Sequence, residues 1–184
     1  MGGHRVVMND DSTELSAHLR SRLAGKSLWD FALDFYARDG VEQACLTLQD
    51  EADVEVTELL WRCWLYRHGL SAGDTPLDVR QWQHDVISPL RRLRRDLKPA
   101  ARERANVASL RQRIKQAELD AERECLLRLE AHSGTGLAPL FEISRPGSTL
   151  EKVLPFSPQL QKKSHLLALG TLQSQLDPYD PTLA

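Results

Sequence analysis

The stretch VTELLWRCWLYRHG, residues 56–69, decides the fold of this chain. Its apolar side chains recur every three or four residues in a wide stripe, which is typical of a helix surrounded by other helices. The sequence therefore predicts a central helix that ends at His68-Gly69, because glycine readily adopts the left-handed conformation that ends helices. We expect Cys63 and Trp64 in the core. Trp61 lies beside the stripe, where it either packs in the core or lines a groove between helices.

Helical spacing continues on both sides of this stretch. Ser27 is positioned to cap a helix with one apolar face, which Asp39-Gly40 ends. Ser88-Pro89 marks either a kink or a new start. Residues 100–131 contain neither proline nor glycine and are expected to form one long helix. Its apolar seam is predicted at Val107, Leu110, Ile114, Ala117 and Ala121.

No stretch shows the alternation of a β-strand closed by a tight turn. The predicted fold class is therefore all-α: a compact bundle of about five to seven helices with one long helix in the C-terminal half, followed by an irregular tail.

The chain divides into three segments by composition. Residues 1–26 form an N-terminal extension with a short helix, and residues 27–131 form the helical domain. Residues 132–184 hold six prolines, and Ser-Gly-Thr-Gly lies near their start at positions 133–136. We expect a partly disordered tail there, with one helical segment at 160–176 that is able to dock on the domain.

Bulk properties exclude several classes of protein. The 184 residues carry a net charge of −2, so overall charge does not indicate a polyanion binder. Apolar runs are far shorter than the roughly 20 residues of a membrane helix, and the N-terminus lacks the apolar core of a secretion signal. Cys45, Cys63 and Cys125 are odd in number and form no metal-binding spacing. We therefore expect a cytoplasmic protein that contains buried thiols and does not cross a membrane.

No catalytic constellation is recognisable in the sequence. Nucleophile-elbow, phosphate-loop, dinucleotide-binding and zinc-protease motifs are all missing. The acidic run at residues 50–55 lacks the ligand spacing of a calcium loop, and one of its members, Asp53, is expected to cap the central helix. We predict no catalytic residue, no metal and no cofactor.

Charge is distributed unevenly along the chain. Residues 1–60 carry 12 acids against five bases, whereas residues 91–115 carry ten bases against two acids. If Leu90, Leu93 and Leu97 face inward, the bases between them face outward. The candidate partner-binding or anion-binding residues are Arg91, Arg92, Arg94, Arg95 and Lys98. Guanidinium groups bind phosphates well, but the same face can simply pair with acids from the first half of the chain. No aromatic residue interrupts these bases, so single-stranded nucleic acid is not favoured.

A second candidate site is a ligand groove near the central helix. Its candidate residues are Trp61, His68, Asp50 and Asp53. His68 lies at a helix C-terminus, where a cation is favourable.

Three longer motifs resemble a known family when taken in this order. They are LWDFALDFYARDGVEQACLTLQDEADVEVTELLWRCWLYRHG (28–69), WQHDVISPLRRLRRDLK (82–98) and IKQAELDAERE (114–124). Together they resemble the proteobacterial family catalogued as domain of unknown function 2390. The chain departs from the family pattern at Glu55-Val56-Thr57, where Asp-Val-Asn is expected. The resemblance implies a bacterial cytoplasmic protein without an assigned activity, and it identifies no catalytic residue.

Three functions remain open at this point. We favour a non-enzymatic protein–protein interaction or adaptor module with a protein partner. The first alternative is an anion or nucleic-acid binder that uses the Arg-rich helix at residues 91–104. The second is a small-ligand-binding protein, or an enzyme of unknown reaction, with its pocket near Trp61 and His68.

Overall fold

The computed structural model describes residues 10–143 and 148–176, and most of them are helical. The longer elements are α1 (Asp10–Ser21), α2 (Leu28–Tyr36), α3 (Val41–Ala52), α4 (Val56–Arg67), α6 (Ser88–Asp96), α8 (Ala105–Thr135) and α10 (Lys163–Gln175). The shorter ones are β1 (Leu70–Ala72), α5 (Leu77–Trp82), α7 (Lys98–Glu103), β2 (Leu140–Glu142) and α9 (Leu150–Val153). The predicted all-α fold with one long helix, α8, is confirmed.

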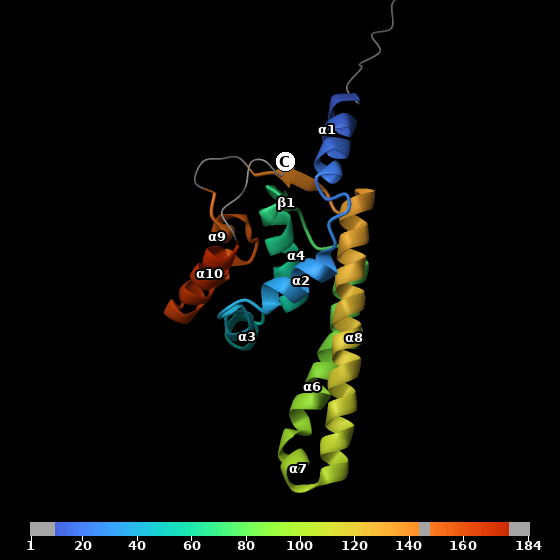
Figure 1. Cartoon of the computed structure of the whole chain (residues 1–184), viewed down its shortest axis with the longest axis vertical. Coiled ribbons are helices and arrows are strands. Elements are labelled where there is room, and N and C mark those ends of the chain that lie inside the picture. The colour runs from blue at the N-terminus through green and yellow to red at the C-terminus, as the bar shows by residue number, and fades with distance from the viewer. Residues whose placement is uncertain (1–9, 144–147, 177–184) are drawn as a thin grey trace, which may run out of the picture.

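Helix α4 lies at the centre of the bundle, between α2, α3 and α8 (Figure 1). Nine of its twelve residues are buried, including Cys63 and Trp64 as predicted. Each large side chain buried in this way stabilises the fold by about 1.5–3 kcal/mol relative to an exposed one. The wide apolar stripe therefore identifies the central helix correctly.

The ends of α2, α3 and α4 follow local chemistry. Ser27 caps α2 as predicted, since its hydroxyl accepts a hydrogen bond from the backbone nitrogen of Asp30 at 3.1 Å. The prediction that Asp53 caps α4 is wrong. Asp53 instead ends α3 in the left-handed conformation at φ 54°, and Glu55 is the N-cap of α4. The backbone nitrogen of Val54 then donates to the carbonyl of Leu48, which closes the end of α3.

Helix α8 turns back on α6 and α7 to form a long hairpin (Figure 1). It begins at Ala105, five residues later than predicted, because Arg104 is extended at φ −131° and reverses the chain. The C-terminal half of α8 packs on α2 and α4. The other end of the hairpin projects beyond the remaining helices. We call residues 91–117 the arm.

The apolar seam of α8 differs from the predicted one. Leu110 and Ala117 are exposed, because the arm is only two helices thick and has no third layer to cover them. Buried positions instead run along the helix at intervals of three and four, with a glutamate among them: Ile114, Glu118, Ala121, Cys125 and Leu129. A charged residue in a buried seam requires partners of opposite charge.

Ser88-Pro89 is not a new start, because the helical residues continue through this position. A π-helical turn, Gln83–Ile87, connects α5 to α6, and Pro89 lies in the first turn of α6. A π-turn is a common cause of a bend in a continuous helix.

The segment after α8 returns to the bundle. Strand β2 pairs with β1 in antiparallel register, with Ser71 opposite Phe141. Strands of three residues are too short for the alternation that predicts a strand, so this pair was not expected. The docking predicted for residues 160–176 is confirmed, since α10 packs on α3 and buries Leu169 and Leu172. Residues 1–9 of the predicted N-terminal extension and residues 144–147 and 177–184 of the predicted tail lie outside the described residues.

Candidate functional site

An open cleft of about 610 Å³ lies between α2, α3, α4 and α8. Its volume is within the range of pockets that hold small molecules or short peptide segments. The apolar lining residues are Trp29, Ala32, Leu33, Ala37, Leu46, Val56, Leu60, Leu119 and Leu126. The polar lining residues are Tyr36, Glu42, Gln49, Thr57, Arg94, Lys115, Glu118 and Glu122. The cleft therefore combines an apolar wall with a group of ionisable side chains.

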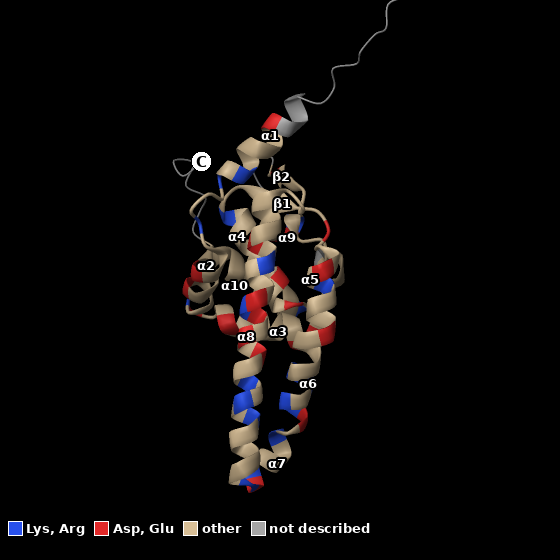
Figure 2. Ribbon diagram, turned by 90° about the vertical axis from the view of Figure 1, so that its right-hand side faces the viewer, with Lys and Arg blue, Asp and Glu red and all other residues tan. Residues whose placement is uncertain are grey.

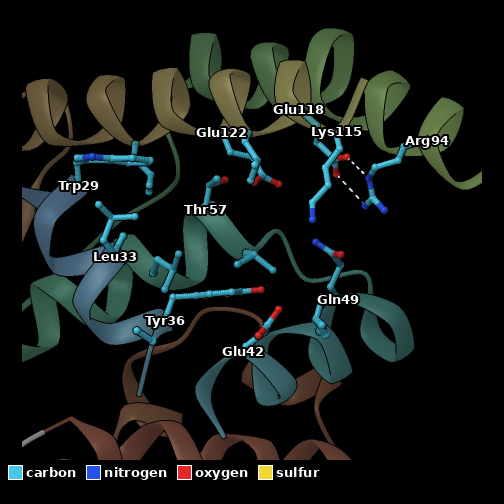
Figure 3. Close-up of a pocket in the computed structure, with 17 residues that line it drawn as sticks. Trp29, Leu33, Tyr36, Glu42, Gln49, Thr57, Arg94, Lys115, Glu118 and Glu122 are labelled. Carbon is cyan, nitrogen blue, oxygen red and sulfur yellow. Dashed lines mark hydrogen bonds and ion pairs between the residues drawn. The ribbon is translucent and has the colours of Figure 1, made fainter. Parts of the chain in front are cut away.

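These two kinds of residue occupy different ends of the cleft. Figure 3 shows Trp29 and Leu33 at one end, with Gln49, Lys115 and Arg94 at the other. Between them, Tyr36 extends along the floor with its hydroxyl toward Glu42. A ligand that fills the whole cleft would therefore be amphipathic.

Two leucines on facing helices remain exposed inside this cleft. Leu33 of α2 is 54% exposed and Leu119 of α8 is 45% exposed. Trp29 lies beside them, and the guanidinium of Arg123 stands 4.9 Å from the centre of its ring. Apolar side chains that gather at one concave place are typical of a surface that another molecule covers.

A buried ion cluster forms the back of the polar end. The Arg91 guanidinium is shared by three carboxylates, lying 3.5 Å from Glu55, 3.4 Å from Glu118 and 3.4 Å from Glu122. Arg94 makes a second, two-pronged contact with Glu118. Arg91 is only 8% exposed, so these charges must be paired to be tolerated. The cluster holds three carboxylates and two guanidiniums, which leaves one excess negative charge.

The pKa values in the cluster reflect this imbalance. Burial raises the pKa of Glu122, and the neighbouring charge of Glu118 raises it further. Burial also raises the pKa of Glu55, although Arg91 opposes the shift. Desolvation disfavours the charge on Arg91, yet the surrounding glutamates outweigh it and raise its pKa. The polar end thus favours an additional positive charge, either a proton or a cationic group.

Tyr36 faces the same end of the cleft. Burial raises the pKa of its hydroxyl, and the neighbouring Cys45, Glu42 and Glu122 add to the shift. The phenol is therefore a hydrogen-bond donor at neutral pH rather than a phenolate.

The predicted basic residues do not form one outward face. Arg91 is buried and Leu93 is exposed, which is the reverse of the predicted orientation, because the glutamates of the cluster draw the guanidinium inward. Arg94 belongs to the cluster, and Arg95 pairs with Asp50 at 2.6 Å. These contacts agree with the alternative that the basic residues pair with acids. Two of these acids, Asp50 and Glu55, come from the first half of the chain. Arg92 and Lys98 remain exposed on the arm.

The predicted groove residues are not brought together. Trp61 is fully buried, and its indole nitrogen donates to the hydroxyl of Ser133, so it packs in the core. His68 lies edge-on to the ring of Trp64 with 5.8 Å between ring centres. Asp50 pairs with Arg95, and Asp53 forms the end of α3. None of the four residues lines the cleft.

The three thiols are buried. Burial raises the pKa of Cys45 to about 12 and that of Cys125 to about 11, and it raises the pKa of Cys63 as well. Thiols with raised pKa values are poor nucleophiles and poor metal ligands.

Within residues 10–143 and 148–176, no group of three or more His, Cys, Asp or Glu side chains has an arrangement that could hold a metal ion. None of the helices in these ranges has the length and apolarity needed to cross a membrane.

One feature of the sequence indicates the buried ion cluster but does not enter the predictions above. Glu118 continues the spacing of Ile114 and Ala121, so it interrupts the apolar seam with a charge. A charged residue at a seam position indicates a buried partner.

Comparison with known protein families gives a match over more than half of the chain. A family model described as "Protein of unknown function (DUF2390)" matches residues 27–129. Every residue that lines the cleft, and the whole arm, lies within this range. No curated protein and no solved structure matches the chain.

Proposed function

The chain belongs to the DUF2390 family of proteins of unknown function, and we propose that it is a helical interaction module whose cleft receives a segment of a partner protein. The segment inserts apolar side chains between Leu33 and Leu119. It places a lysine or arginine next to Glu122. The partner is thus recognised by a short amphipathic, cationic sequence.

The exposure of Leu33 and Leu119 carries this proposal. Both leucines line the same cleft and leave about half of their surface in water. Covering apolar surface contributes about 25 cal/mol per Å². An inserted side chain contacts both leucines and Trp29 at once, so the gain in binding free energy is concentrated at one point. In protein interfaces, too, a few central residues contribute most of the binding energy.

The charge at the other end of the cleft supports a cationic partner. The cluster of Glu55, Glu118, Glu122, Arg91 and Arg94 has one excess negative charge, and Glu42 adds another at the rim. Lys115 offsets part of this charge but is exposed, and within residues 10–143 and 148–176 no carboxylate lies within ion-pair distance of it. A partner cation replaces the proton that the raised pKa of Glu122 otherwise favours.

The burial of the thiols and the ion pairs of Glu118 support binding rather than catalysis. The thiols are buried and have raised pKa values. Glu118 is held by two guanidiniums, which leaves its oxygens poorly placed to accept a proton from a substrate.

A peptide selection tests the proposal. The immobilised protein is used to select from a phage-displayed library of random peptides, and affinities of the enriched peptides are measured by calorimetry. We expect sequences in which apolar residues neighbour a lysine or arginine. The double variant Leu33→Glu/Leu119→Glu should weaken binding at least tenfold, which corresponds to about 1.4 kcal/mol.

A matched control separates the cleft from general surface effects. Leu77 and Leu167 are 62% and 63% exposed and do not line the cleft, so Leu77→Glu/Leu167→Glu should leave affinity unchanged. Equal loss in both double variants, or enrichment of acidic peptides, would contradict the proposal. So would a metabolite that copurifies in stoichiometric amounts and blocks the selected peptides, because the cleft would then be a small-molecule site.

A further inference from the structure

We propose that the arm, residues 91–117, binds the phosphate backbone of double-stranded nucleic acid. This surface is distinct from the cleft except at Arg94 and Lys115, which line the cleft and also belong to the arm. The proposed binding surface includes α6, α7 and the start of α8. It is therefore larger than the Arg-rich helix at residues 91–104.

Six basic side chains of the arm are available for such contacts. All six are exposed and, in the part of the chain that the structure describes, none has a carboxylate within 4.0 Å: Arg92, Lys98, Arg102, Arg104, Arg113 and Lys115. The arm has only two acids, Asp96 and Glu103. Free guanidinium groups bind phosphate oxygens through two hydrogen bonds, which makes them effective phosphate ligands.

The other basic residues of the arm already have partners. Arg91 and Arg94 contact the glutamates of the cluster, and Arg95 pairs with Asp50. Arg111 donates from Nε to the carbonyl of Arg94, which ties α8 to α6. These contacts hold the hairpin together and leave the six free bases on a fixed support.

The charge of the rest of the molecule restricts contact to the arm. Outside residues 91–115 the chain carries 14 bases and 24 acids. Figure 2 shows many acidic residues along the body of the bundle and mostly basic ones along the projecting hairpin. A polyanion is therefore repelled by the body and attracted to the arm.

The geometry of the arm favours a duplex. The part of α8 within the arm, residues 105–117, is about 20 Å long at 1.5 Å per residue. A duplex of that length carries about 12 phosphate charges. No aromatic residue occurs between positions 91 and 117, so the stacking that holds single strands has no platform here.

Fluorescence anisotropy with labelled 24-base-pair DNA and RNA duplexes tests the proposal with the full chain. Matched single strands, poly-glutamate and anionic lipid vesicles serve as competitors. If most of the six bases contact phosphates, affinity should fall about 1,000-fold between 50 and 200 mM salt. Duplexes should compete better than every other polyanion, and comparison of DNA with RNA shows which duplex is preferred.

Two variants that each lose four positive charges identify the surface that binds the duplex. Lys98→Gln/Arg102→Gln/Arg104→Gln/Arg113→Gln removes four bases from the arm and should lower affinity at least 100-fold. The control Lys26→Gln/Arg80→Gln/Lys162→Gln/Lys163→Gln removes four exposed bases from the body and should lower it less than threefold. Thermal unfolding checks that both variants fold. Undetectable duplex binding at 50 mM salt, equal losses in the two variants, or preference for poly-glutamate, vesicles or single strands would overturn the proposal.

Discussion

The indole nitrogen of Trp61 donates a hydrogen bond of 2.9 Å to the hydroxyl of Ser133, although 72 positions separate the two residues. Both side chains are fully buried. The hydroxyl in turn donates to the carbonyl of Leu129 at 2.8 Å. This chain of hydrogen bonds connects the middle of α4 to the last turns of α8, and it explains why Trp61 belongs to the core.

Ser133→Ala should destabilise the protein by about 1–3 kcal/mol, because the indole nitrogen of Trp61 is then buried without an acceptor. Urea unfolding measures the free energy. Thr135→Ala is the control on the same helix, since this exposed hydroxyl donates to a carbonyl of its own helix. Equal stability of the Ser133→Ala variant and the wild type would show that the hydrogen bond contributes nothing.

Arg91→Met should destabilise the protein by about 3 kcal/mol, because Glu55, Glu118 and Glu122 lose a shared cation in a buried place. The neighbouring Arg92→Met removes an exposed, unpaired base and should change stability by less than about 0.5 kcal/mol. Chemical denaturation of both variants gives the comparison. Similar losses at the two positions would mean that the ion cluster does not stabilise the fold.

The pH dependence of stability should report the raised pKa of Glu122. Because the folded chain binds this proton more tightly than the unfolded chain, stability contributed by Glu122 is present below the unfolded pKa of 4.5 and is lost as pH rises through the higher folded value. Glu122→Gln removes the titration. The stability of the variant relative to the wild type should therefore increase with pH from 4.5 upward, and then level off.

The control for that experiment is Glu124→Gln, which removes a charge that pairs with Arg128 near the surface of the same helix. Denaturant unfolding at a series of pH values measures both variants. A stability difference for Glu122→Gln that declines with rising pH would contradict the raised pKa.

His68 should titrate with a pKa of about 4 in the folded protein. Burial lowers the pKa, and Lys26 and Arg67 lower it further, which outweighs the favourable position at a helix C-terminus. The folded chain thus binds this proton less tightly than the unfolded chain, so stability from His68 is present above pH 6.5 and is lost as pH falls toward 4. An NMR titration of the imidazole measures the value, and Lys26→Gln should raise it. A folded pKa at or above 6.5 would contradict this environment.

Local patterns in the sequence were sufficient for much of the fold. The wide apolar stripe identified α4, the serine before Leu28 identified the start of α2, and the helical segment at 160–176 was correctly expected to dock. These features depend on neighbouring residues, whose spacing is visible in the sequence.

The site depends on contacts between distant segments and could not be predicted in the same way. Local spacing predicts that leucine faces inward and arginine outward on α6, but Arg91 contacts carboxylates from α8 and from the N-cap of α4. Leu33 of α2 is exposed, and only the packing of α8 against α2 shows that it shares a cleft with Leu119. The position of each residue is set by tertiary partners rather than by local propensity.

The four tryptophan indole N–H signals in a ¹H–¹⁵N correlation spectrum test the cleft most directly. Trp29 lines the cleft, whereas Trp61 and Trp64 are buried in the core and the Trp82 nitrogen donates to the carbonyl of Ala121. On addition of the best selected peptide, we predict a saturable shift of the Trp29 signal while the other three stay in place. A peptide that binds without moving Trp29, or that moves Trp61 or Trp64 instead, would contradict the assignment of the cleft as the binding site.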